Sequence, residues 1–262
     1  MALEKQLAQN ELELNRLEDK LAFTMEGVRC IIQFECNPPL GQVLMDIHEL
    51  DIVHQDFHPG NILSSSFKDY DLNISDFGLS KLIGANPNNP EKKNIFGVLP
   101  YIAPEVLSGD EEYTKAADVY SYGIIAYEIV TGFPPYPDKD LAMKMCNGLR
   151  PKIPFQTPKL ITRTIMRCWD ARVTHRLTFK ELREELWKYY YDYRDYLNEV
   201  RNKDSEIGIQ IKKAKEFSAN QESTNTTTTT HIHKQFIPVD FLIFQNFQNP
   251  RTKKILKGNL KN

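Results

Sequence analysis

The sequence has little of what extracellular and membrane proteins carry. Its four cysteines are too few for a disulfide scaffold and do not show metal-site spacing. No run approaches the roughly 18 apolar residues of a membrane span, and the charged start from Glu4 onward is unlike a signal peptide. A formal net charge of −2 gives no general attraction to nucleic acid or membranes. These absences predict a cytoplasmic protein without a membrane span, and they disfavour a nucleic-acid partner.

Three oxygen-bearing side chains recur at fixed spacing in the segment from residue 54 to residue 78. Asp56 precedes Asn61 by five residues, and Asp76 follows fifteen residues later. Carboxylate and amide oxygens are ligands that Mg²⁺ prefers, and a further carboxylate can accept a hydroxyl proton. Phosphoryl transfer asks little more of a protein than held metal ions and an oriented hydroxyl. The spacing therefore predicts a phosphoryl-transfer site.

The region from about Ile47 to Leu186 resembles the large lobe of a protein kinase, with six motifs in the family's order. These motifs are His54–Asn61, Asp76–Gly78, Ala103–Glu105, Asp118–Gly123, Cys168–Asp170 and Arg176–Phe179. The resemblance implies an α+β fold that is mainly α-helical, a kinase-like large C-terminal lobe with a truncated or absent small lobe. It also implies ATP and Mg²⁺ as cofactors and a protein substrate.

Site roles follow from the same resemblance. Asp56 would be catalytic, with His58 beside it, whereas Asn61 and Asp76 would bind the metal ion of the nucleotide. Structural roles are implied for His54, Phe77, Gly78, Glu105, Asp118 and Arg176. His54 and Phe77 are expected in internal packing, and Asp118 is expected to anchor the catalytic-loop backbone. Glu105 and Arg176 are expected to form a buried ion pair, which is costly to break from one side.

Three positions depart from the family pattern. Gln55 replaces an Arg that binds the activation-loop phosphate in many kinases, and no Ser, Thr or Tyr lies between Lys81 and Pro100 to carry one. We therefore expect that loop phosphorylation does not switch this protein. His58 stands where serine/threonine kinases have a phosphate-contacting Lys. Val98 replaces a Thr that helps to hold the catalytic Asp, which leaves Ser/Thr versus Tyr specificity open.

Composition divides the chain into four parts. Residues 1–22 repeat apolar side chains at steps of three and four, which predicts an amphipathic or coiled-coil-like helix. Residues 23–46 are expected to hold a remnant strand, Val28–Cys36, and a hinge-like segment. Residues 47–200 form the kinase-like lobe. Residues 201–262 are expected to be helical, then low in complexity, and to end in a basic tail.

Local patterns predict the elements around the motifs. Helices are expected over Gly41–Leu50 and over Ala116–Val130, which is apolar on nearly every face and therefore buried. Short strands are expected at Ile62–Leu63 and Leu72–Ile74. The stretch Thr178–Glu181 has the pattern of a capping box and predicts the start of another helix.

The parts that cradle the phosphates of a nucleotide are not evident. A kinase small lobe needs about 70 residues, whereas 53 precede His54. The sequence contains no Gly-x-Gly-x-x-Gly and no V-A-I-K-like strand with a phosphate-binding Lys. Two hypotheses stay open: a kinase-like phosphotransferase acting on a protein hydroxyl, and a weak or inactive pseudokinase that serves as a scaffold.

Two other enzyme classes share part of the pattern. His54–Asn61 is similar to the H-x-D-x-H-P-G-N loop of aminoglycoside and choline kinases, which generally lack D-F-G and A-P-E. His54, Asp56 and His58 could begin a metal-hydrolase cluster, but no further His or Cys set completes it. An incomplete cleft would leave apolar surface open, so we expect the N-terminal helix or Val28–Cys36 to cover it. Otherwise the protein should self-associate, through residues 3–21 or the exposed cleft face.

Overall fold

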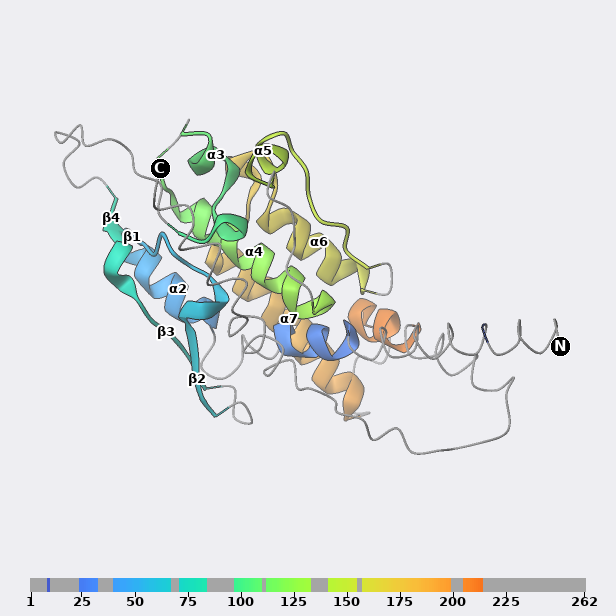
Figure 1. Cartoon of the computed structure of the whole chain (residues 1–262). Coiled ribbons are helices and arrows are strands. Elements are labelled where there is room, and N and C mark those ends of the chain that lie inside the picture. The colour runs from blue at the N-terminus through green and yellow to red at the C-terminus, as the bar shows by residue number, and fades with distance from the viewer. Residues whose placement is uncertain are drawn as a thin grey trace.

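The fold is built from helices around one central helix, with short strands at one edge (Figure 1). The computed structural model describes residue 9 and residues 24–32, 40–66, 71–83, 97–109, 112–132, 141–154, 157–198 and 205–213. The α-helices labelled in Figure 1 are α2 (Leu40–Glu49), α3 (Pro104–Leu107), α4 (Lys115–Thr131), α5 (Leu141–Cys146), α6 (Lys159–Cys168) and α7 (Phe179–Leu197). The expected mainly helical α+β class is confirmed. None of the helices within the described ranges is long and apolar enough to cross a membrane.

Helix α4 is the centre of the core. Twelve of its residues are buried, from Ala117 to Val130, as expected for a helix without a polar face. Gly123 lets α6 approach closely, because a Cβ there would lie 2.7 Å from the Cβ of Cys168. The helix ends at Gly132, which has a φ of 71° and donates its N–H to the Glu128 carbonyl. The buried helix predicted over Ala116–Val130 is therefore confirmed.

Two antiparallel strand pairs lie at the edge of the helical core. Strand β1 (Ile52–Val53) pairs with β4 (Lys81–Leu82), and β2 (Ile62–Ser66) pairs with β3 (Asp71–Ile74). Ile62 is opposite Ile74, so the start of β2 and the end of β3 lie side by side. Both predicted strands are confirmed, and their pairing brings residues 61 and 75 together. The described residues form two-stranded sheets only, so a five-stranded small-lobe sheet is not among them.

Short 3-10 turns shape the segments between these elements. They are η1 (Pro59–Asn61), η2 (Phe77–Leu79), η3 (Leu99–Tyr101) and η4 (Val173–His175). Helix α7 then begins at the predicted capping box: Glu181 N–H donates to Thr178 Oγ1 at 3.2 Å, and Thr178 N–H donates to Glu181 at 2.8 Å. Residues 206–213 form a further helix. Its Gln210 side chain accepts the N–H of Leu160 and so caps α6.

The strand predicted at Val28–Cys36 is wrong over its described part, because residues 24–32 are helical. Val28, Ile31 and Ile32 are fully buried, and their spacing of three and four residues places them on one helical face. The β-branched composition favoured a strand, but packing on one face decided the outcome. Residues 33–36 lie outside the described residues, as do the hinge-like segment and most of the predicted helix 1–22.

The segment 24–32 also does not cover the cleft face. Gly27 lies against the carbonyl oxygen of Ile129, near the C-terminal end of α4, whereas the catalytic loop meets α4 at Asp118. Eleven residues of helix separate these positions by roughly 16 Å. Figure 1 accordingly shows the helix of residues 24–32, in blue near the label of α7, away from β1 and β4. The expectation that this segment would close the cleft is wrong for residues 28–32.

The contact at Gly27 can be tested by adding one methyl group. A Cβ at this position would lie 2.3 Å from Ile129 O and 2.8 Å from Val130 Cα, both backbone atoms. In an open helix Gly→Ala gains about 1 kcal/mol, but here we expect Gly27→Ala to lower the free energy of unfolding by about 1–3 kcal/mol through overpacking. Urea denaturation measures the change. Arg29→Ala, in the same helix, should cost less than about 1 kcal/mol; a stabilised Gly27→Ala protein contradicts the packing.

Candidate active site

The catalytic-loop backbone is held by one buried carboxylate. Asp118, in the first turn of α4, is completely buried and accepts the N–H groups of His54 at 2.9 Å and Gln55 at 3.2 Å. Gln55 has a φ of 67°, in the left-handed region, so these bonds stabilise a turn that costs energy. Asp118 therefore anchors the catalytic-loop backbone, the role that the family resemblance implied.

His48 supports the same carboxylate and was missed by sequence reasoning. Its Nε2 lies 2.9 Å from Asp118 Oδ2, and its ring packs 4.9 Å from that of Phe179. A signal was present: His48 follows the fully buried Leu44 by four residues, so it lies on the buried face of α2.

Asn61 joins the catalytic loop to the segment that carries Asp76. Its Nδ2 donates to the carbonyl of Asp56 at 2.8 Å, which leaves the amide oxygen of Asn61 for another partner. The carbonyl of Asn61 accepts both the N–H and the hydroxyl of Ser75, at 2.8 and 3.2 Å. Asp76 follows directly, so the strand pair brings residue 76 next to Asn61, which in turn binds Asp56.

Asp76 is held at the start of η2 in the left-handed region, with φ 60° and ψ 63°. Its Oδ1 is 3.4 Å from the N–H of Gly78, and its side chain is exposed. His54 is fully buried and contacts the Ser75 carbonyl through Nε2 at 3.1 Å. Phe77 packs on His54 at 4.8 Å yet is 42% exposed. The expected internal packing is therefore found for His54 and is wrong for Phe77, because no described element covers the outer face of Phe77.

Asp56 has a partly desolvated carboxylate. Its Oδ1 is buried and has no hydrogen-bond partner within normal distance; His58 Nε2 lies 3.5 Å from it. Gly97, with a φ of 121°, lies against the same oxygen, and Val98 after it offers no hydroxyl. Burial raises the pKa of Asp56, but contacts with His58 and Asn61 outweigh burial and leave it below its usual range. Asp56 is therefore a carboxylate at neutral pH, with one acceptor oxygen unused.

A protein-only metal cage is not part of this arrangement. Across the described ranges, no three His, Cys, Asp or Glu side chains are grouped to hold a metal ion. The hydrolase hypothesis for His54, Asp56 and His58 therefore has no support, and His54 is committed to the interior. Mg²⁺ instead takes one or two protein oxygens, with phosphates and water completing its octahedron. Asn61 and Asp76 fit that requirement.

Comparison with known proteins agrees with the geometry. A family model for the protein kinase domain matches residues 13–188. The chain belongs to the protein kinase family. The match includes both D-F-G and A-P-E, so it places the chain with protein kinases rather than with small-molecule phosphotransferases.

Individual relatives are similar over about half of the chain. A dual specificity protein kinase of Dictyostelium discoideum, shkE, is 36% identical over 141 residues, covering 52% of this chain and 19% of the relative. A probable serine/threonine-protein kinase of the same organism is 33% identical over 140 residues, 52% and 10%. A protein kinase and PP2C-like domain-containing protein of Oryza sativa subsp. japonica is 32% identical over 182 residues, 56% and 27%. The chain therefore spans less than a third of each of these three relatives.

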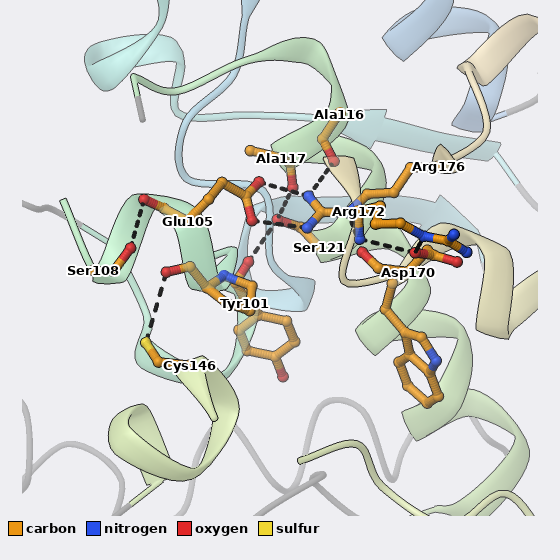
Figure 2. A network of polar contacts seen from close by, with 12 residues as sticks. Tyr101, Glu105, Ser108, Ala116, Ala117, Ser121, Cys146, Asp170, Arg172 and Arg176 are labelled. Carbon is orange, nitrogen blue, oxygen red and sulfur yellow. Dashed lines mark hydrogen bonds and ion pairs between the residues drawn. The ribbon is translucent and has the colours of Figure 1, made fainter. Parts of the chain in front are cut away.

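The predicted ion pair between Arg176 and Glu105 is present in the lobe. Figure 2 shows Arg176 pointing at Glu105, with Nη1 and Nη2 donating to the two carboxylate oxygens at 2.6 and 2.7 Å. Arg176 also donates to the carbonyls of Ala116 and Asp170 and lies 5.2 Å from the centre of the Tyr120 ring. Its side chain is completely buried. The pair joins the A-P-E segment to α4 and to the turn before α7.

A second acid, Glu128, lies near the C-terminal end of α4. Tyr101 donates its hydroxyl to Glu128 at 2.7 Å, and its ring lies 6.0 Å from that of His58. Burial raises the pKa of Glu128 to about 7, and the hydrogen bond from Tyr101 offsets only part of this effect. Glu128 therefore changes charge near neutral pH, and Tyr101 connects it to the ring of His58.

Removing Arg176 should destabilise the lobe strongly. Arg176→Ala leaves Glu105 buried without its cation, so we expect a loss of about 3–5 kcal/mol in the free energy of unfolding. The neighbouring Arg172 pairs with Asp170 at 3.4 Å, with 69% of its side chain exposed. Arg172→Ala should therefore cost less than about 1 kcal/mol. Urea denaturation measures both losses. Equal losses in the two variants would show that the buried pair stabilises the lobe no more than the exposed pair does.

Glu128 should make stability depend on pH. Its pKa is near 4.5 in the unfolded chain and about 7 in the folded protein, so between these values the folded state binds more protons. Stability from this residue is then full below about pH 4.5 and falls as pH rises to 7, by about 3 kcal/mol in total. Glu128→Gln should remove this decline in urea unfolding at pH 5 and pH 8. Tyr101→Phe, which deletes the hydrogen bond that lowers the pKa, should enlarge it. A difference between wild type and Glu128→Gln that does not change with pH contradicts the assignment.

Proposed function

We propose that this chain transfers the γ-phosphoryl group of ATP to a Ser or Thr hydroxyl of a protein. The observation that carries the proposal is the ionised carboxylate of Asp56 on a loop that Asn61 binds directly and that Asn61 ties to Ser75, the residue before Asp76. An ionised carboxylate at this place can accept the proton of a substrate hydroxyl. Two relatives are named as a dual specificity and a serine/threonine-protein kinase, which supports a Ser or Thr hydroxyl of a protein as the acceptor.

The roles of the chain's own residues follow from their contacts. Asp56, ionised at neutral pH, orients the hydroxyl and accepts its proton as the oxygen attacks phosphorus. Asp118 fixes the backbone on which Asp56 stands. Asn61 and Asp76 would hold Mg²⁺, which when bound neutralises charge on the phosphates. The hydrogen bonds between Asn61 and Ser75 keep these two ligands in register.

A second candidate function is a scaffold without turnover. Within these 262 residues there is no Gly-x-Gly-x-x-Gly and no lysine in a V-A-I-K context. Removing an electrostatic clamp of that kind costs about 3–4 kcal/mol in transition-state stabilisation. We therefore expect slow turnover from the chain alone, and a scaffold if nucleotide does not bind.

Nucleotide binding with and without Mg²⁺ tests the proposal. We expect ATP affinity to rise with Mg²⁺ in wild type and to fall about tenfold or more in Asp76→Asn. Groups that merely support a metal ligand already contribute about 10–100-fold. Asp56→Asn should keep Mg²⁺-dependent binding but lose about 100-fold or more of phosphate transfer from labelled ATP to casein. Isothermal calorimetry and the transfer assay measure the two quantities.

Asp46→Asn is the matched control, since Asp46 is exposed on α2; it should leave both quantities unchanged. Absence of ATP binding in wild type at any Mg²⁺ concentration would support the scaffold instead. Equal loss of binding in Asp56→Asn and Asp76→Asn would contradict the separate roles given to these residues.

A further inference from the structure

The imidazole of His58 is fixed by the residues that follow it. The N–H of Gly60 donates to His58 Nδ1 at 3.0 Å, which caps η1. A backbone N–H can only donate, so Nδ1 must carry a lone pair. In the neutral ring the proton is then on Nε2. The local backbone therefore selects one tautomer of His58.

Two further contacts fix the position of the ring. A Cβ on residue 60 would lie 2.7 Å from His58 Cε1 and 2.9 Å from Nδ1, so the ring occupies space that only glycine leaves open. Its other neighbour is Tyr101, with ring centres 6.0 Å apart and planes inclined by 36°. Tyr101 is itself tied to Glu128. The ring is thus held between η1 and η3.

The fixed ring directs its N–H at the catalytic carboxylate. His58 Nε2 lies 3.5 Å from Asp56 Oδ1, the buried oxygen that has no other partner. Hydrogen bonds in catalytic sites are often long without substrate and shorten in the reacting complex. The nitrogen that could reach a phosphate is the same one that faces Asp56, because Nδ1 is occupied by Gly60.

We propose that His58 is a positioning residue, a neutral Nε2–H donor that orients Asp56 through Oδ1. The substrate hydroxyl then gives its proton to Asp56, and His58 keeps its own. This inference rests on the proposed phosphoryl transfer, and it differs from a Lys-like contact with the phosphate, which the sequence position of His58 suggested. A residue with that contact would act on nucleotide affinity, whereas a positioning residue acts on turnover.

The tautomer can be measured without any catalysis. Long-range ¹H–¹⁵N NMR of the full chain distinguishes Nε2–H from Nδ1–H imidazoles, and the His58→Asn variant identifies the signal of residue 58. We expect His58 only as Nε2–H. Gly60→Ala, which forces the ring from its place, should introduce the Nδ1–H form or move both nitrogen frequencies. A wild-type protein with Nδ1–H at His58 overturns the proposal, as does a spectrum that Gly60→Ala leaves unchanged.

Two substitutions at His58 distinguish the roles of its two ring nitrogens in the transfer assay. In His58→Asn, the amide oxygen can still accept the Gly60 N–H, but the donor to Asp56 is gone. In His58→Gln, the amide nitrogen reaches the place of Nε2 and restores that donor. We expect kcat with casein to fall about tenfold or more in the Asn variant, as for loss of a hydrogen bond to a charged group. The Gln variant should stay within about threefold of wild type, and KM for ATP should be the same in all three.

The outcomes distinguish this inference from the proposed function. Wild-type kcat in His58→Asn overturns the positioning role, and so does an unchanged kcat with a raised KM for ATP, which would show a phosphate contact. If wild type transfers no phosphate to casein, the catalytic role falls with the proposed function. The NMR result still decides in that case whether His58 carries its proton on Nε2, the nitrogen that faces Asp56.

Discussion

The structure depends on one buried carboxylate. Asp118 accepts two backbone N–H groups of the catalytic loop and contacts the ring of His48, and none of its surface is exposed. A charge at this depth is stable only because every partner is in place. Since Asp118 stands in the first turn of α4, the most buried helix of the lobe sets the position of the loop that carries Asp56. Core packing and site geometry are therefore a single constraint.

Helix α4 also contacts other parts of the site. Near its other end, Glu128 holds Tyr101, whose ring lies against His58. Ser121 is buried and donates its hydroxyl to the Tyr101 carbonyl at 2.7 Å. Arg176 reaches the carbonyl of Ala116 at its start while it binds Glu105. Each link is buried or half-buried, so a change in α4 would be felt by several parts of the site at once.

Much of the lobe could be predicted because its signals are local. The strands at Ile62 and Ile74, the capping box at Thr178 and the stop at Gly132 each depend on a few neighbouring residues. The strand predicted at Val28–Cys36 was wrong over residues 28–32, because the same β-branched residues fit a helical face once Gly27 packs on Ile129. His48 was missed because its partner, Asp118, is 70 residues away.

The sequence by itself determined the kinase family, the order of the motifs and the residue types at the site, because these reside in short stretches with characteristic spacing. Only the tertiary structure decided which atoms face one another. It left Asp56 Oδ1 without a partner, turned His58 Nε2 toward it and raised the pKa of Glu128 by burial. Distances, burial and tautomers arise from contacts between distant segments, which no local pattern contains.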